Sequence, residues 1–208
     1  MESHKLIVKF FVENPASVEE SAFVPVFHSI IQAHALPGHL LIDVADYTHV
    51  PDGPGTLLVS HEANIYMDHT VGGRLGLMYQ RKQPIPGAES FRDRLAHTFA
   101  AGLRAAALLA EHPTFAGRLK FRTGDAVFRV NDRLLAPNTH DTYAQVAPAL
   151  RAFLADLYRG SDVSIDYTPG PPLRMFEVSV KAAKAPGISD LLDRLSPLLR
   201  AETPAPSR

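Results

Sequence analysis

The residues best suited to chemistry are crowded into residues 49–69. This stretch, HVPDGPGTLLVSHEANIYMDH, holds three histidines and three acidic residues. Imidazole and carboxylate groups bind zinc, iron and manganese, and they also act as general acids and bases. The same residue types occur on the solvent-exposed face of an ordinary β-strand. The stretch therefore raises two hypotheses, a reactive site or a solvated strand.

Alternation of side chains limits what this stretch can do. We predict one long strand over residues 56–68, in which successive side chains point to opposite faces. His61 then lies on the apolar face, so Ser60, His61 and Glu62 cannot form a catalytic triad. The helical His-Glu-x-x-His zinc motif is also missing, because position 65 is isoleucine. The polar face of the predicted strand carries Ser60, Glu62, Asn64, Tyr66 and Asp68.

A metal centre remains one interpretation of the stretch. If neighbouring strands curl over the polar face, four ligand-type side chains converge, namely His49, Glu62, Asp68 and His69. Such a set suits zinc, iron or manganese and would support a hydrolase-like enzyme. The alternative is a solvated strand face with histidines in the turns at its two ends. The spacing matches no established metal motif, so no metal or other cofactor is expected on the favoured interpretation.

A second set of residues is a candidate for ligand binding without catalysis. The loop PDGPG at 51–55 is tight, because prolines fix φ and glycines permit unusual φ. It is either a sharp corner or a rim that presents backbone groups to a ligand. Basic residues near 118–133 either hold acidic groups or form the solvated face of a strand. The candidate ligand-binding residues are His49, Asp52, Ser60, Glu62, Asn64, Tyr66, Arg122 and Arg129.

The elements around these residues predict an α+β fold, with a largely antiparallel mixed sheet packed by three to four helices. Capping-box patterns at Ser17 and Ser90 open the first two helices. Pro25 interrupts the first pattern, so the first helix is expected to start late or to kink there. One domain is expected over residues 1–200, followed by a flexible tail at 201–208. Strands are expected at 5–12, 40–47, 56–68, 74–82, 119–121, 126–130, 163–167 and 175–181. Helices are expected at 17–33, 90–112, 139–159 and 188–199.

Composition narrows the function classes. The 208-residue chain has no cysteine, which excludes disulfides and thiolate chemistry. Its formal net charge of −1 provides no overall attraction to nucleic acid or to a membrane, and neither is expected as a partner. The N-terminus has only a short apolar run, interrupted by charge, so we expect a cytoplasmic protein without a signal peptide or membrane span. No dinucleotide or nucleophile-elbow motif occurs.

Several motifs taken together resemble a set of uncharacterised bacterial proteins of similar length. They are DVADY at 43–47, HVPDGPG at 49–55, HE at 61–62, GRLG at 73–76, Tyr79 with Arg81 and Lys82, and NDRLLAPNT at 131–139. A further resemblance is to the peptide-binding accessory proteins of crocagin biosynthesis, a ribosomal peptide pathway. That resemblance implies a non-catalytic protein that holds a precursor peptide, and it assigns no site residues.

The sequence thus favours a non-catalytic protein that binds an extended peptide along a sheet edge or groove. The strands expected at the edges are 74–82 and 175–181, and a peptide or protein is the expected partner. Two alternatives stay open. One is the metal-dependent enzyme that uses His49, Glu62, Asp68 and His69. The other is a structural subunit of a homo-oligomer, such as a homodimer.

Overall fold

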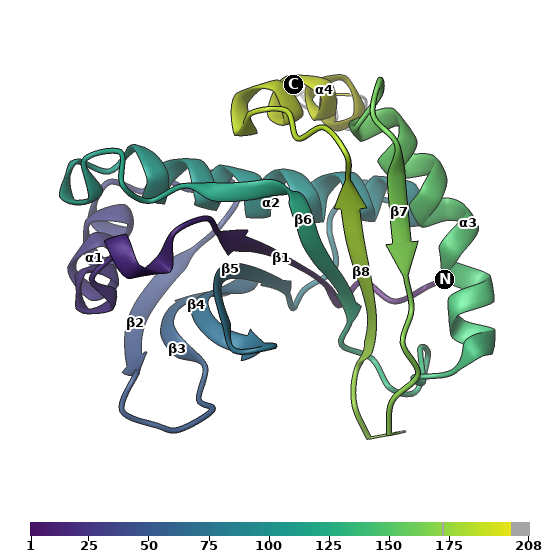
Figure 1. Ribbon diagram of the computed structural model, residues 1–208, viewed down its shortest axis with the longest axis horizontal. Coiled ribbons are helices and arrows are strands. Elements are labelled where there is room, and N and C mark those ends of the chain that lie inside the picture. The colour runs from purple at the N-terminus through teal and green to yellow at the C-terminus, as the bar shows by residue number, and fades with distance from the viewer. Residues whose placement is uncertain (172, 201–208) are drawn as a thin grey trace, which may run out of the picture.

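An eight-stranded antiparallel sheet forms the centre of the computed structural model, which describes residues 1–171 and 173–200 (Figure 1). The strand order across the sheet is β2-β3-β4-β5-β1-β6-β8-β7. Helices pack against the sheet, so the predicted α+β class is confirmed. The strands are β1 (Leu6–Val12), β2 (Leu41–Tyr47), β3 (Gly55–Ser60), β4 (Ala63–Val71), β5 (Arg74–Arg81), β6 (Phe121–Val130), β7 (Val163–Asp166) and β8 (Phe176–Ala182).

The main helices are α1 (Phe23–Gln32), α2 (Phe91–Glu111), α3 (His140–Leu157) and α4 (Ile188–Arg200). α2 packs on β1 and β5, and α4 packs on α2. The Phe10 ring meets Phe99 of α2 edge-on, with the ring centroids 6.1 Å apart. The capping box predicted at Ser90 is present, since its hydroxyl accepts from the Asp93 amide while the Asp93 carboxylate accepts from the Ser90 amide. None of the described helices combines the length and apolar character that a membrane span requires.

The first strand of the chain is the most deeply buried. β1 lies between β5 and β6, and each of its seven residues is buried. Its even-numbered residues belong to the core under the helices. Its odd-numbered residues, Ile7, Lys9 and Phe11, lie on the other face and are nevertheless at most 2% exposed. The sheet therefore has an interior on both faces near its centre, and one of the residues buried there is a lysine.

The predicted single strand over residues 56–68 is wrong. The structure divides it into β3 and β4, which pair antiparallel around a turn at His61 and Glu62. The Ser60 hydroxyl accepts a hydrogen bond from the Ala63 amide at 3.0 Å, which closes the turn through a side chain. The turn therefore changes which residues of β3 and β4 point to the same face of the sheet. Leu57 now shares a face with Tyr66, its partner on β4.

The two separate strands expected at 119–121 and 126–130 are also wrong. The structure has one strand there, β6, and its register against β1 shifts at a bulge between Arg122 and Ala126. Three intervening residues are accommodated without reversing the chain. The late start predicted for the first helix is confirmed, because it begins at Phe23 and two short 3-10 turns precede it. Pro25 thus falls in the first helical turn, where proline is tolerated.

The two sheet edges also differ from those predicted. Residues 74–82 and 175–181 correspond to β5 and β8, which have neighbours on both sides. The edges are β2 and β7. The reason is long-range: β1 pairs with both β5 and β6, and β7 adds outside β8. The tail predicted at 201–208 lies outside the described residues.

Candidate functional site

The edge strand β2 is open and apolar. Its seven residues are all exposed or only partly buried. Seven large apolar side chains are exposed within the described residues, and four of them lie on β2 or beside its ends. An exposed edge with apolar side chains is a template for another strand. The four, with their exposed fractions, are Leu40 (66%), Ile42 (57%), Tyr47 (40%) and Val50 (40%).

The opposite edge is less accessible. β7 has only four residues, and α3 packs beside it. The Tyr143 hydroxyl of α3 donates to the Ile165 carbonyl at 3.5 Å, and the Tyr143 ring stacks on Tyr167 with a centroid separation of 5.2 Å. A short edge flanked by a helix is a common protection against strand addition. A helix also packs beside β2, namely α1, but β2 is the longer edge and the one with exposed large apolar side chains, so it is the better candidate for a partner.

Carboxylate side chains accept hydrogen bonds from backbone amides along β2. The Val44 amide donates to the Asp43 carboxylate at 2.8 Å, between adjacent residues. The Thr48 amide and hydroxyl both donate to Asp46, and these bonds lower the pKa of the Asp46 carboxyl. Before β2 begins, the Leu40 amide donates to Glu62 at 2.7 Å. The edge thus carries carboxylates near its start, its middle and its end.

Glu62 remains ionised at neutral pH. Its partial burial favours the neutral form, but the pKa of this carboxyl is lowered overall, because the Leu40 amide donates to it and His39 and His61 lie nearby. Together with Asp43 and Asp46, it gives the β2 edge a negative charge.

A pocket of about 510 Å³ lies at the far end of β2, between the PDGPG loop and the β4–β5 hairpin. Asp52, Tyr47 and Thr70 contribute to its lining. His69 also lines it and contacts the Glu20 carboxylate at 3.0 Å. Asp52 adopts a left-handed conformation with φ 55°, which bends the loop sharply. The pocket extends the β2 edge with polar groups, most of them exposed or half-buried.

The four candidate metal ligands do not come together, and each has different neighbours. Glu62 is in the β3–β4 turn, whereas His69 is seven residues further on, which along a strand is about 23 Å. Asp68 is buried against Lys9, and His69 contacts Glu20. His49 is exposed in the β2–β3 loop. Across residues 1–171 and 173–200, no group of three or more histidine and acidic side chains is placed to hold a metal ion.

The other candidate ligand residues are also dispersed. Ser60 is fully buried and closes the β3–β4 turn, so its hydroxyl is not presented to a ligand. Asn64 donates to the Tyr66 hydroxyl at 2.9 Å, on the sheet face opposite the helices. Arg129 pairs with Glu177 of β8, and Arg122 donates to the Glu13 carbonyl at 3.3 Å.

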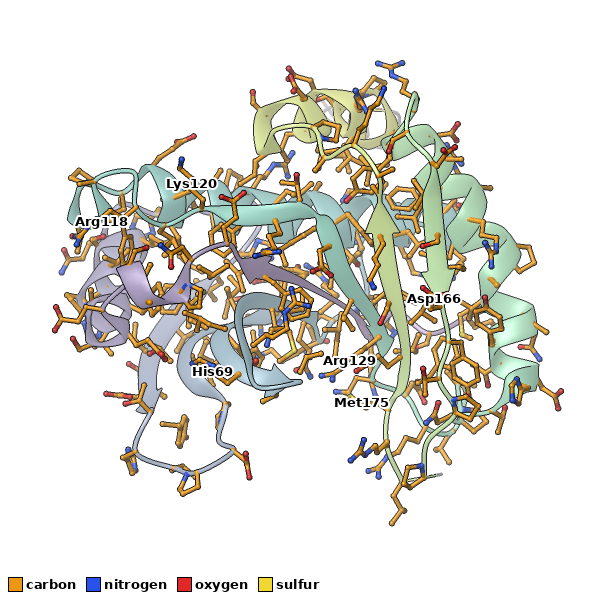
Figure 2. The ribbon with its side chains drawn as sticks, viewed as in Figure 1. His69, Arg118, Lys120, Arg129, Asp166 and Met175 are labelled. Atoms are coloured by element: carbon orange, nitrogen blue, oxygen red, sulfur yellow. The ribbon has the colours of Figure 1, made fainter. Side chains whose placement is uncertain are left out.

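The predicted basic cluster near residues 118–133 is not a single group. Arg122 and Arg129 are seven residues apart on one strand, a separation of about 23 Å. Figure 2 shows Arg118 and Lys120 at one end of the molecule and Arg129 near the other end of β6. Arg122 and Arg129 are therefore too far apart to bind the same small anionic ligand.

A buried ion pair lies beneath the β4–β5 hairpin. The Lys9 ammonium donates to the Asp68 carboxylate at 2.5 Å and to the Asp68 carbonyl at 2.9 Å, and both side chains are 0% exposed. Burial lowers the pKa of Lys9, while the neighbouring carboxylate works to raise it. Thr70 donates to the same carboxylate oxygen through its amide and hydroxyl. The pair fixes the hairpin on β1 and is closed to solvent.

One polar cluster was not anticipated from the sequence. His39 Nε2 lies 2.9 Å from the buried Tyr79 hydroxyl, and Arg81 is 3.5 Å from the same oxygen. Burial lowers the pKa of His39 and raises the pKa of Tyr79. Arg81 also donates to the carbonyls of Gln83 and Pro84. The cluster joins the segment before β2 to β5, and the 40-residue separation explains why local patterns missed it.

The His39 contact predicts a pH-dependent stability. Unfolded histidine binds a proton near pH 6.5, whereas the folded protein resists protonation of His39. The free energy of unfolding should therefore fall as the pH drops below about 6.5. Urea titrations between pH 5 and 8 should show a weaker fall for His39→Gln than for wild type. Equal pH slopes for wild type and His39→Gln would contradict this role.

Comparisons with models of known protein families, with curated proteins and with solved structures find no match to this chain. A function is therefore inferred from the geometry of β2 and its surroundings.

Proposed function

We propose that this protein is a non-catalytic binding protein that accepts an extended peptide as an added strand beside β2. The observation that carries the proposal is the open seven-residue edge with exposed apolar side chains on and beside it. A guest strand forms main-chain hydrogen bonds with such an edge, and alternate side chains of the guest provide specificity.

Local features of β2 favour this mode of binding. Its pairing with β3 shifts register between Leu41 and Asp43, at the position of Ile42. The shift leaves Ile42 exposed rather than packed. The Val44 amide, which donates to an adjacent side chain, can exchange that local acceptor for a guest carbonyl. The resemblance to crocagin accessory proteins makes a ribosomal precursor peptide the biological guest that we propose.

The proposal is tested with three synthetic peptides, each long enough to pair with the seven residues of β2. Valine alternates with lysine in the first, with threonine in the second and with glutamate in the third. We expect at least one of them to bind in calorimetric titrations. Val44→Pro should weaken that binding tenfold or more, because proline removes an amide donor while remaining acceptable in an edge strand.

The matched control is Val163→Pro at the start of β7, the other edge strand, because the register with β8 turns the Val163 amide outward. It should leave peptide affinity within about twofold of wild type. Circular dichroism should verify that both proline variants are folded. Absence of binding for all three peptides would overturn the proposal. Equal weakening by Val44→Pro and Val163→Pro would also overturn it, because the effect would not be specific to β2.

A further inference from the structure

We infer that the guest strand of β2 is cationic, with lysine or arginine alternating with apolar residues. The inference rests on the proposed function and names the chemical class of its ligand. Its support is the distribution of charge over the chain and over the open edge.

Charge is strongly segregated along the chain. Between Phe10 and Gly73 there are eight acidic residues and no lysine or arginine, so all 21 basic residues of the chain lie outside this segment. The segment contains α1, β2, β3 and β4. One of its acids, Asp68, is neutralised by Lys9. The near-zero net charge of the whole chain therefore conceals an acidic segment that contains the open edge.

Several carboxylates lie along the path of a guest strand. Asp43 and Asp46 are exposed residues of β2 itself. Glu62 lies at the start of β2, where it accepts from the Leu40 amide. Asp52 and Glu20 line the pocket at the end. A cationic strand therefore meets opposite charge along the whole length of the edge, whereas an acidic strand meets like charge.

The same charges argue against a second copy of this chain as the occupant. Antiparallel pairing of two β2 strands would bring Asp43 and Asp46 of each copy beside those of the other. Like charges on paired strands are destabilising, and charged edges are a common protection against self-association. The exposed apolar side chains Leu40, Ile42 and Tyr47 nevertheless favour a guest with apolar residues. An alternating basic and apolar strand satisfies both requirements.

The test compares the same three peptides in calorimetric titrations. The valine–lysine peptide should bind tightest and the valine–glutamate peptide weakest. Asp43→Asn with Asp46→Asn should weaken the valine–lysine peptide about three- to tenfold, since each exposed ion pair contributes a few-fold in affinity. Binding of the valine–threonine peptide should change by less than about twofold. Asparagine at 43 still accepts from the Val44 amide, so the backbone of β2 is preserved.

The matched control is Asp166→Asn on β7, an exposed acid of the opposite edge strand (Figure 2). It should leave the affinity of all three peptides unchanged. Raising the salt concentration should weaken the valine–lysine peptide selectively.

The possible outcomes separate this inference from the proposed function. Equal affinity for the lysine and threonine peptides, both lost in Val44→Pro, would overturn the cationic guest and leave strand addition intact. Absence of any peptide binding would overturn both. Sedimentation should show a monomer. A dimer that Val44→Pro dissociates would overturn the inference in favour of a second copy at β2.

Discussion

Lys9→Met should lower the free energy of unfolding by about 3–5 kcal/mol, the cost of leaving one member of a buried ion pair without its partner. Both Lys9 and Asp68 are fully buried, and the lysine ammonium contacts the carboxylate and the carbonyl of Asp68. The second carboxylate oxygen of Asp68 is buried and has no hydrogen-bond partner among the described residues. Without Lys9, the carboxylate would have to be buried uncompensated or become protonated. Urea denaturation at pH 7 measures the loss.

Two control variants separate the ion pair from the loss of packing. Lys9→Met with Asp68→Asn removes both charges and keeps an acceptor for Thr70, so it should regain much of the lost stability. Arg92→Met breaks the exposed Arg92–Asp156 pair and should cost less than about 1 kcal/mol. If Lys9→Met alone were as stable as the double variant, the buried charge would not be the cause.

Gly55→Ala is expected to lower the free energy of unfolding by about 2–5 kcal/mol, combining a left-handed backbone with overpacking. Gly55 begins β3 with φ 63°. A Cβ there would lie 2.0 Å from the Met67 carbonyl oxygen, which belongs to the paired strand β4. A backbone atom in a sheet cannot move aside without breaking the pairing. The same substitution should therefore also disturb the PDGPG loop at the end of β2.

Gly38→Ala is the matched control, because it has a similar φ of 72° and no heavy atom within 4 Å of the added Cβ. It should lose only about 1–2 kcal/mol, the cost of the left-handed backbone alone. Thermal and urea unfolding of the two variants measure the difference. Equal losses at 55 and 38 would show that the contact with Met67 is not limiting.

Local signals predicted much of the fold. The apolar run of β1 and the capping box at Ser90 both depend on residues close together in the chain, and the structure confirms both elements. The strands expected at 56–68 and 74–82 require a reversal between them, and Gly72 and Gly73 there have positive φ. The β3–β4 turn was missed, because it contains no glycine or proline and is closed by the Ser60 hydroxyl instead.

The order of the strands could not be obtained in the same way. Which strands become edges depends on the insertion of β1 between β5 and β6, a pairing between distant segments. The candidate edge residues Asp43 and Asp46 lie within a predicted strand but were not singled out. Counting charged residues segment by segment, rather than over the whole chain, would have identified the acidic segment that contains them.

Hydrogen exchange of the backbone amides, with and without the valine–lysine peptide, tests the central claim most directly. Strand addition predicts slower exchange on binding for amides of β2, with β7 unchanged, because only the open edge gains main-chain hydrogen bonds. Protection confined to β7, or binding that leaves the exchange of β2 unaltered, would contradict the assignment of β2 as the peptide-binding edge.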